Sequence, residues 1–324
     1  MTETTPPGPG KLWRAEARAG RPCHTRGPVH SRRFSSAVIA ALVAAACAAP
    51  REPPMHVRVP RAAFTGDPDA ITVSWIGHAT LLIGIRDHWF LTDPMFSERL
   101  AGVMPRQVGP AIAPAELPPL DAILVSHAHF DHLDLPSLRR LGDTPLVVPP
   151  GVPTFLPGNL PQRQVVALDA WQAFRRGDVR ITAVPASHGD GRYLIDRWHT
   201  RSHTGWVIEV GDRTVYFAGD TGYIAAQARE LRRRFRIDVS LIPVGPAGRA
   251  GWIERLRADV HATPEAALDL FQDVGAQWMV PIHFGTFFAP ADRELPLIEA
   301  AVARRHLEHS VRILAIGETT TFRY

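Results

Sequence analysis

Cysteine is nearly absent from this chain of 324 residues: Cys23 and Cys47 are the only two, and both precede residue 50. Beyond that point the chain has no thiol that could form a disulfide, bind a metal or act as a nucleophile. Long apolar runs are also missing. None reaches the ~18 residues of a membrane-spanning helix, which excludes a polytopic membrane protein. The 45% hydrophobic content is nevertheless typical of a globular protein with a large core.

An excess of positive charge is missing outside the first part of the chain. Residues 1–61 hold ten Lys or Arg against three Glu, a net charge of +7, whereas residues 62–324 hold 26 basic and 29 acidic residues, a net charge of −3. A protein that binds nucleic acid needs cations clustered on its folded domain. We therefore expect no nucleic-acid partner for the body of this chain.

The basic first segment has the pattern of an export signal. Arg32 and Arg33 precede an apolar stretch over 34–46, and this order of charged, apolar and small residues is typical of a secretory signal. The stretch from Leu42 to Cys47 resembles a bacterial lipoprotein signal, in which the cysteine becomes the lipidated N-terminus. The alternative is an ordinary Ala-rich helix.

Composition thus predicts three regions. Residues 1–50 form the leader, the Pro-rich residues 51–69 form a linker, and residues 70–324 form the folded domain. We expect an exported protein of the cell envelope, either periplasmic or held at a membrane surface through a lipidated Cys47. If the leader is not a signal, the protein is cytoplasmic.

The body alternates short apolar runs with helical patterns. Strands are expected at 71–76, 81–85, 89–92, 121–126, 146–148, 165–168, 179–184, 206–210, 214–218, 239–243 and 279–282, and helices at 133–141, 224–235, from 264 onward and at 295–307. Thr263 followed by Pro264 marks the start of the third helix, as an N-cap and an N1 proline. Two comparable halves of strands with inserted helices predict two β-sheets packed together with helices outside.

The strongest chemical signal follows the apolar run 121–126 directly. The segment from Ser126 to Asp134 reads SHAHFDHLD and contains the candidate metal ligands His127, His129, Asp131 and His132. The first two are spaced so that both can face one ion, whereas the last two turn toward a second ion as a helix begins. Imidazole and carboxylate ligands suit Zn²⁺, Mn²⁺ or Fe.

Three later strands also end in candidate ligands. His188 follows the expected strand 179–184, Asp220 follows 214–218, and His283 follows 279–282. A single histidine after a strand is usually a hydrogen-bonded core or turn residue. Because the three side chains follow the first cluster in this order, together they are a far more specific signal of a metal site.

This order of residues resembles the signature of the dinuclear members of the metallo-β-lactamase superfamily. The resemblance implies an α+β fold, a four-layer αββα sandwich with the site at the edge between the two sheets. By the same resemblance one divalent ion is held by His127, His129 and His188, the other by Asp131, His132 and His283, and Asp220 bridges both. Zn²⁺ is the expected metal, with Mn²⁺ or Fe as alternatives. The commonest β-lactamases have a cysteine where Asp220 stands, which argues against β-lactamase activity.

Further motifs resemble the N-acyl-phosphatidylethanolamine phospholipase D group and the related ascorbate-phosphate lactonase-like hydrolases. These motifs are 75–80, 91–94, 217–223, 261–266 and 283–287. The match is closer to the phospholipase D group, although that group usually has an aromatic residue after the metal histidine, where this chain has Gly189. We therefore expect a small-molecule or phospholipid substrate.

The implied chemistry is hydrolysis by a hydroxide that two metal ions share. A phosphodiester is the favoured substrate bond. The alternative substrate bond within the same fold is a lactone or another carboxylic ester. The alternative to an enzyme is a non-catalytic metal-binding module of the cell envelope. Besides Asp131 and Asp220, the expected catalytic residue is His261, as proton donor to the leaving group or hydrogen-bond donor to the substrate; the alternative role for His261 is to cap the following helix.

Other polar residues are expected to support the site. Asp93 and Asp134 are candidate acceptors for the second ring N–H of ligand histidines, and for Asp134 an ordinary helix-start carboxylate is an equal alternative. His78 is predicted to be a hydrogen-bonded turn residue, with contact to the edge of the site as the alternative.

Overall fold

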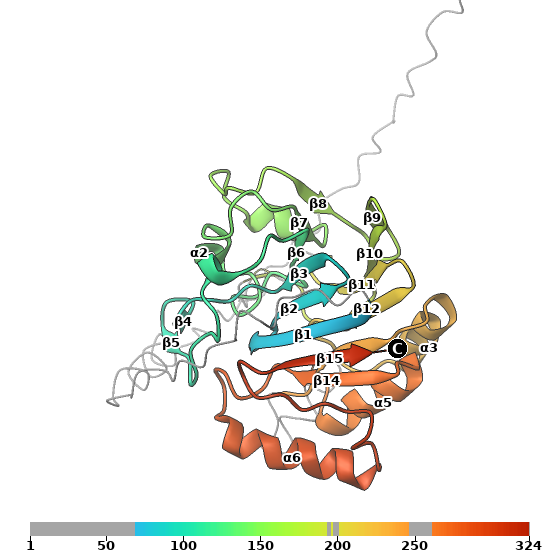
Figure 1. Ribbon diagram of the computed structural model, residues 1–324. Coiled ribbons are helices and arrows are strands. Elements are labelled where there is room, and N and C mark those ends of the chain that lie inside the picture. Colours follow the sequence, from blue (N-terminus) through green and yellow to red (C-terminus); the bar gives the residue numbers. More distant parts are fainter. Residues whose placement is uncertain (1–68, 193–195, 197–200, 246–260, 324) are drawn as a thin grey trace, which may run out of the picture. The chain divides into compact units, whose positions relative to one another are not determined.

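The computed structural model describes residues 69–192, 196, 201–245 and 261–323 (Figure 1). The predicted leader, the linker up to residue 68 and Cys47 lie outside these residues. None of the helices within the described ranges combines the length and the apolarity that a bilayer span requires.

Two mixed β-sheets form the centre of the described part of the chain. The first has seven strands in the order β15-β1-β2-β3-β6-β7-β8, and the second has six in the order β14-β13-β12-β11-β10-β9. The bounds in the first sheet are β1 Ala70–Gly77, β2 Thr80–Ile85, β3 His88–Thr92, β6 Ala122–Leu124, β7 Leu146–Val148, β8 Val165–Ala167 and β15 Thr319–Arg323. Those in the second are β9 Ala173–Arg176, β10 Val179–Val184, β11 Gly205–Val210, β12 Arg213–Phe217, β13 Val239–Pro243 and β14 Trp278–Ile282. A separate small hairpin pairs β4 Arg99–Leu100 with β5 Met104–Pro105.

Each sheet changes from antiparallel to parallel pairing. Strands β1, β2 and β3 are antiparallel neighbours, and β3, β6, β7 and β8 are parallel to one another. In the second sheet β9 to β12 are antiparallel, and β12, β13 and β14 are parallel. Parallel strands all end at one edge of a sheet, and ligands bind preferentially outside such carboxyl ends.

Side-chain alternation assigns the two faces of the first sheet. Leu124 of β6 belongs to the main core, together with apolar residues of the second sheet such as Ile208, whereas Ile123 packs on the opposite face with Leu138. This is the two-residue period of a strand that is buried on both faces. The two sheets are thus layers of one sandwich.

Helices lie outside the sheets. Their bounds are α2 Leu135–Leu138, α3 Ala225–Arg234, α5 Pro264–Val274 and α6 Ala291–Arg304, with 3₁₀ turns η2 Pro114–Glu116 and η3 Val152–Phe155. Helix α5 packs against β13 and lies between α3 and α6. It begins as predicted: the Thr263 side chain accepts from the Ala266 N–H at 3.2 Å, and Gly275 ends the helix with a φ of 68°.

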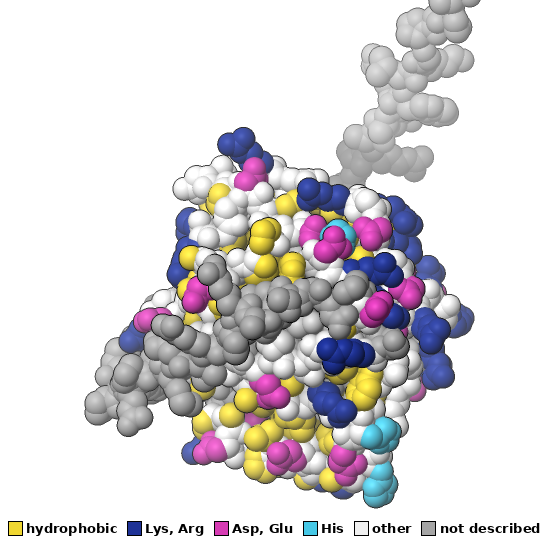
Figure 2. All heavy atoms as spheres, viewed as in Figure 1, with side chains coloured by type: hydrophobic (Ala, Val, Ile, Leu, Met, Phe, Trp, Pro, Cys, Tyr) yellow, Lys and Arg dark blue, Asp and Glu magenta, His cyan; other side chains and the backbone are white. Residues whose placement is uncertain are grey.

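Several elements differ from the sequence prediction. The helix expected at 133–141 is only the four residues of α2. Asp134 caps its start, and after it the N–H groups of Arg140 and Leu141 bond to carbonyls three residues back, at 3.0 and 3.2 Å, which is 3₁₀ and not α-helical bonding. Edge strands β9 and β15 were not expected, because exposed Arg and Thr residues give them no apolar alternation. On the face shown in Figure 2, acidic and basic side chains are scattered among uncharged ones, and several basic side chains lie together along the right side.

Candidate metal centre

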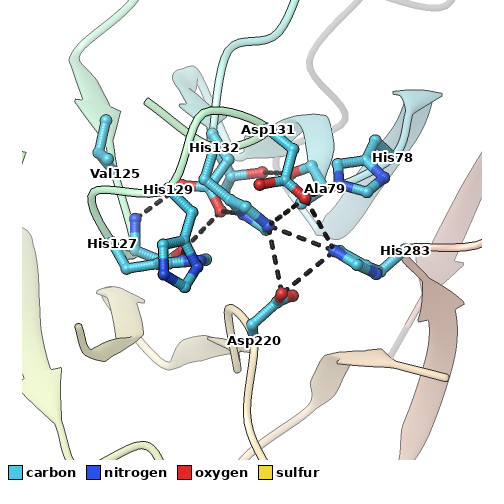
Figure 3. Close-up of polar contacts among 12 residues, drawn as sticks. His78, Ala79, Val125, His127, His129, Asp131, His132, Asp220 and His283 are labelled. Atoms are coloured by element: carbon cyan, nitrogen blue, oxygen red, sulfur yellow. Dashed lines mark hydrogen bonds and ion pairs between the residues drawn. The ribbon is translucent and has the colours of Figure 1, made fainter. Parts of the chain in front are cut away.

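The predicted ligands come from the carboxyl ends of strands in both sheets. His127 follows β6 in the first sheet, and Asp220 and His283 follow the parallel strands β12 and β14 in the second. Because the parallel strands of each sheet end at one edge, these side chains meet although they are far apart in the sequence (Figure 3).

One group consists of three histidines. The Nδ1 atom of His129 lies 3.0 Å from the Nε2 atom of His127 and 3.0 Å from the Nε2 atom of His188. Nitrogen ligands of a tetrahedral zinc ion, at 2.0–2.1 Å from the metal, lie about 3.3 Å from one another. The three ring nitrogens are therefore spaced like the ligands of one divalent ion.

A second group lies beside the first. The Nε2 atoms of His132 and His283 are 3.3 Å apart, and the Asp131 Oδ2 atom lies 3.7 Å from the former and 3.8 Å from the latter. Together with a ring nitrogen of His78, these atoms form one of the clusters that could hold a metal ion. The spacing again fits an ion with nitrogen and oxygen ligands.

Asp220 lies between the two groups (Figure 3). Its Oδ2 atom is 3.4 Å from His132 Nε2, 3.2 Å from His283 Nε2 and 3.9 Å from His188 Nε2. Its Oδ1 atom is buried and has no hydrogen-bond partner among the described residues. A buried carboxylate oxygen without a donor is costly, and a cation would satisfy it. The donor set and its geometry therefore fit a pair of divalent ions.

The structure thus brings all the predicted ligands together, and their role as ligands stays a prediction. Asp93 supports them as expected, because its Oδ2 atom accepts from His132 Nδ1 at 2.6 Å and from Ser126 Oγ at 2.6 Å. This contact turns His132 Nε2 toward the site. Asp134 has the alternative role: its carboxylate caps α2 and accepts from Ser97 Oγ at 2.6 Å.

His261 also lies at the site. Its Nδ1 atom is 3.5 Å from Asp220 Oδ2, and its side chain is 18% exposed, so it can reach a bound molecule. The Thr263 hydroxyl, not His261, caps helix α5. The capping alternative for His261 is therefore wrong, and its role as proton donor stays a prediction.

Sequence reasoning considered one further residue of the site without favouring it and missed another. His78, for which a turn role was favoured over contact with the edge of the site, places its Nε2 atom 3.1 Å from Asp131 Oδ2. The buried Arg192 donates from Nη1 to the carbonyls of Ala128 at 2.8 Å and Leu133 at 2.9 Å, and so holds both ends of the ligand loop. The motif 75–80 is a signal that could have revealed His78, whereas no local pattern marks Arg192.

Electrostatics divide the histidines into two kinds. Burial lowers the pKa of His127 well below its usual value, and the neighbouring histidines add to this effect. Burial alone would also lower the pKa of His132 and His283, but the surrounding carboxylates outweigh the effect of burial. The pKa of His132 is raised well above its usual value, and that of His283 is raised to about 9. In return, these histidines keep the pKa of Asp131 and Asp220 well below the usual range despite their burial.

The backbone at the site is strained. His78, Asp93 and His283 have positive φ values of 57°, 34° and 67°, although none is a glycine. Such conformations cluster at functional sites, where the surrounding structure enforces them. Gly219, before Asp220, has a φ of 60°, and a Cβ atom there would lie 2.5 Å from the Ser126 Cβ atom, so this position requires glycine.

Comparison with known proteins agrees with this geometry. Residues 88–284 match the sequence profile of the β-lactamase superfamily domain. An uncharacterized protein of Mycobacterium tuberculosis is 34% identical over 258 residues, which are 76% of this chain and 67% of that protein. The N-acyl-phosphatidylethanolamine-hydrolyzing phospholipase D 1 of Caenorhabditis elegans is 29% identical over 236 residues, which are 66% of this chain and 64% of the worm protein.

A solved structure shows the same fold. The isothiocyanate hydrolase from Delia radicum gut bacteria superposes with a TM-score of 0.63 at 19% identity, over 78% of this chain and all of that one. At this identity the likeness concerns the fold alone. The predicted α+β sandwich is confirmed.

Proposed function

Because this chain belongs to the metallo-β-lactamase superfamily of metal-dependent hydrolases, we propose that it hydrolyses a phosphodiester bond in a phospholipid with two divalent ions, Zn²⁺ being preferred. The observation that carries this proposal is the position of Asp220 between two groups of ligand atoms. Two bound ions would activate a shared water and neutralise charge on the attacking and departing oxygens of an in-line displacement.

The side chains around the site supply the remaining functions. Asp131 and Asp220 stay anionic, which favours cations at the site. His261, beside Asp220 and partly exposed, is placed to donate a proton to the departing oxygen. Arg192 holds the ligand loop by its carbonyl groups, which limits movement of the ligands during turnover.

Apolar groups near the site support an amphiphilic substrate. The Phe288 ring is 39% exposed, and its centroid lies 6.5 Å from that of His283. The neighbouring Thr286 carbonyl accepts from the Gln107 N–H at 2.7 Å, which joins this loop to the segment after β5. At the β4–β5 turn Val103 is 55% and Met104 37% exposed. In the proposed function these exposed apolar groups would contact the acyl chains of the substrate, and the relative from C. elegans bears a phospholipase name.

The test is an assay of the full chain on vesicles that contain N-acyl-phosphatidylethanolamine, with release of phosphatidic acid as the readout. We expect activity with Zn²⁺, none after chelation, and recovery on adding the metal back. D220N should lower kcat by at least ~10³-fold, because it removes the charge that lies between the two ion sites.

The same assay also tests the alternative substrate bonds. An N-acyl-homoserine lactone and a simple carboxylic ester serve as comparison substrates, and R163Q, at an exposed surface arginine, is the control variant. Hydrolysis of the lactone but of no phosphodiester would contradict the proposal. Equal turnover with and without chelator would contradict any metal-dependent chemistry.

A further inference from the structure

His78 contacts a predicted metal ligand without belonging to the predicted ligand set. It lies on the turn between β1 and β2, at the same edge of the first sheet as the carboxyl end of β6. Its side chain is 1% exposed, and its Nε2 atom is 3.1 Å from Asp131 Oδ2 (Figure 3). We propose that His78 is a positioning residue, whose Nε2–H donates to Asp131 and thereby sets the affinity of the ion site formed by Asp131, His132 and His283.

The backbone of His78 is held on both sides. Its N–H donates to the Thr286 hydroxyl at 2.9 Å. Its carbonyl accepts from Trp75 Nε1 at 2.8 Å and from the His283 N–H at 3.1 Å. These bonds fix the positive φ of His78, so the start of its side chain has one position.

The ring is held as firmly as the backbone. Its centroid lies 3.9 Å from the ring centroid of His283 and 5.2 Å from that of Phe287, which meets it edge-on at 81°. A ring packed between two others cannot swing away from Asp131. The donor is therefore in place before any ion binds, and such preorganisation lowers the cost of binding.

Asp131 has few other means of orientation. Among the described residues, its remaining carboxylate contacts are the Nε2 atoms of His132 and His283 at 3.7 and 3.8 Å, both predicted to face the ion. A carboxylate oxygen has lone pairs for one N–H donor and one cation at the same time. His78 can thus orient Asp131 as Asp93 orients His132. Loss of such an outer partner typically costs 10–100-fold in metal affinity.

This inference rests on the two-ion site of the proposed function, so its test measures metal affinity without substrate. The full chain and its variants are equilibrated with Zn²⁺ and a graded series of chelator, and bound metal is measured by mass spectrometry. The variant H129L, which removes a ligand from the other group only, assigns each of the two dissociation steps to its site. H309L, at an exposed histidine, is the control.

We expect H78L to weaken the ion at Asp131, His132 and His283 by about 10–100-fold and to leave the other ion unchanged. H78Q should restore most of the affinity, because its amide N–H reaches the place of Nε2–H, whereas H78N is too short and should bind like H78L. Comparison of H78Q with H78N keeps the test valid if H78L does not fold.

Three results would overturn the inference. The first is unchanged metal affinity in H78L and H78N. The second is an equal loss of metal affinity in H78Q and H78L, which would make His78 itself a ligand. The third is uptake of a single ion by the wild-type chain. A wild type that binds two ions, responds to these variants as expected and hydrolyses no phosphodiester would contradict the proposed function alone.

Discussion

Single residues at this site differ in protonation according to their neighbours. His127 has other histidines around it and loses its proton readily, whereas His132 and His283 face the carboxylates of Asp131 and Asp220 and keep theirs. A histidine must be neutral to bind a metal ion. In the proposed two-ion site, the ion beside His127 would therefore bind with little competition from protons, whereas the ion beside His132 and His283 would displace protons from both rings.

Metal binding should accordingly release protons at neutral pH. The pKa of His283, raised to about 9, means that its ring is protonated near pH 7 and neutral above that pKa. We expect calorimetric titration with Zn²⁺ at pH 7 to give heats that differ between buffers of different ionisation enthalpy, and a smaller difference at about pH 10. H283Q should reduce the release at pH 7. Equal heats in both buffers at pH 7 would show that the rings are already neutral.

At the scale of elements, the ends of the strands opposite the site are joined by His88, the first residue of β3. Its Nδ1 atom lies 3.1 Å from Asp121 Oδ1, just before β6, and its Nε2 atom lies 3.1 Å from Asp178 Oδ1, in the turn between β9 and β10. Because β3 belongs to the first sheet and β9 and β10 to the second, this histidine connects the two sheets.

We expect H88Q to lower the free energy of unfolding in acid more than in base. Burial alone would lower the pKa of His88, but Asp121 and Asp178 raise it above its usual value. A raised pKa stabilises the folded state fully below the unfolded value of about 6.5, and this contribution disappears as pH rises through the folded pKa. Urea unfolding should show a loss of about 0.5–1 kcal/mol near pH 5.5 and a smaller one near pH 9. A loss independent of pH would mean that the neutral ring contributes only by packing.

At the scale of the whole molecule, residues 62–324 have 26 basic and 29 acidic residues, a net charge of −3, and both signs of charge lie on the face shown in Figure 2. The leader, by contrast, has a net charge of +7 over 1–61. We propose that the leader brings the enzyme to the cell envelope and that a lipid on Cys47 holds it at the membrane where its substrate lies.

This proposal predicts the distribution of the full chain in a bacterial host that processes lipoproteins. Wild type should sediment with membranes, and C47S should move to the soluble fraction while keeping its activity on dispersed substrate. C23S is the matched control and should behave as wild type, because Cys23 precedes the apolar stretch of the signal. Membrane association that C47S leaves intact would exclude lipidation as the anchor.

Much of the site could be predicted because its ligands follow strands. Ser126 to Asp134 comes after a continuous apolar run, and His188, Asp220 and His283 each follow another, so topology alone places them at one edge. The start of α5 was equally local, since Thr263 and Pro264 act on their own helix. The start of α2 is as local, since Asp134 caps it. The strands β9 and β15 were not predictable, because each forms only by pairing with a neighbouring strand.

The order and chemical type of the predicted ligands, and with them the family and the expected metal chemistry, were determined by the sequence alone. Only the tertiary structure decided that His78 faces Asp131, that Asp93 orients His132 and that Arg192 holds the ligand loop. The physical reason is the range of the interactions. A strand and its following turn are encoded by adjacent residues, whereas these contacts form between segments that meet only after the two sheets have packed.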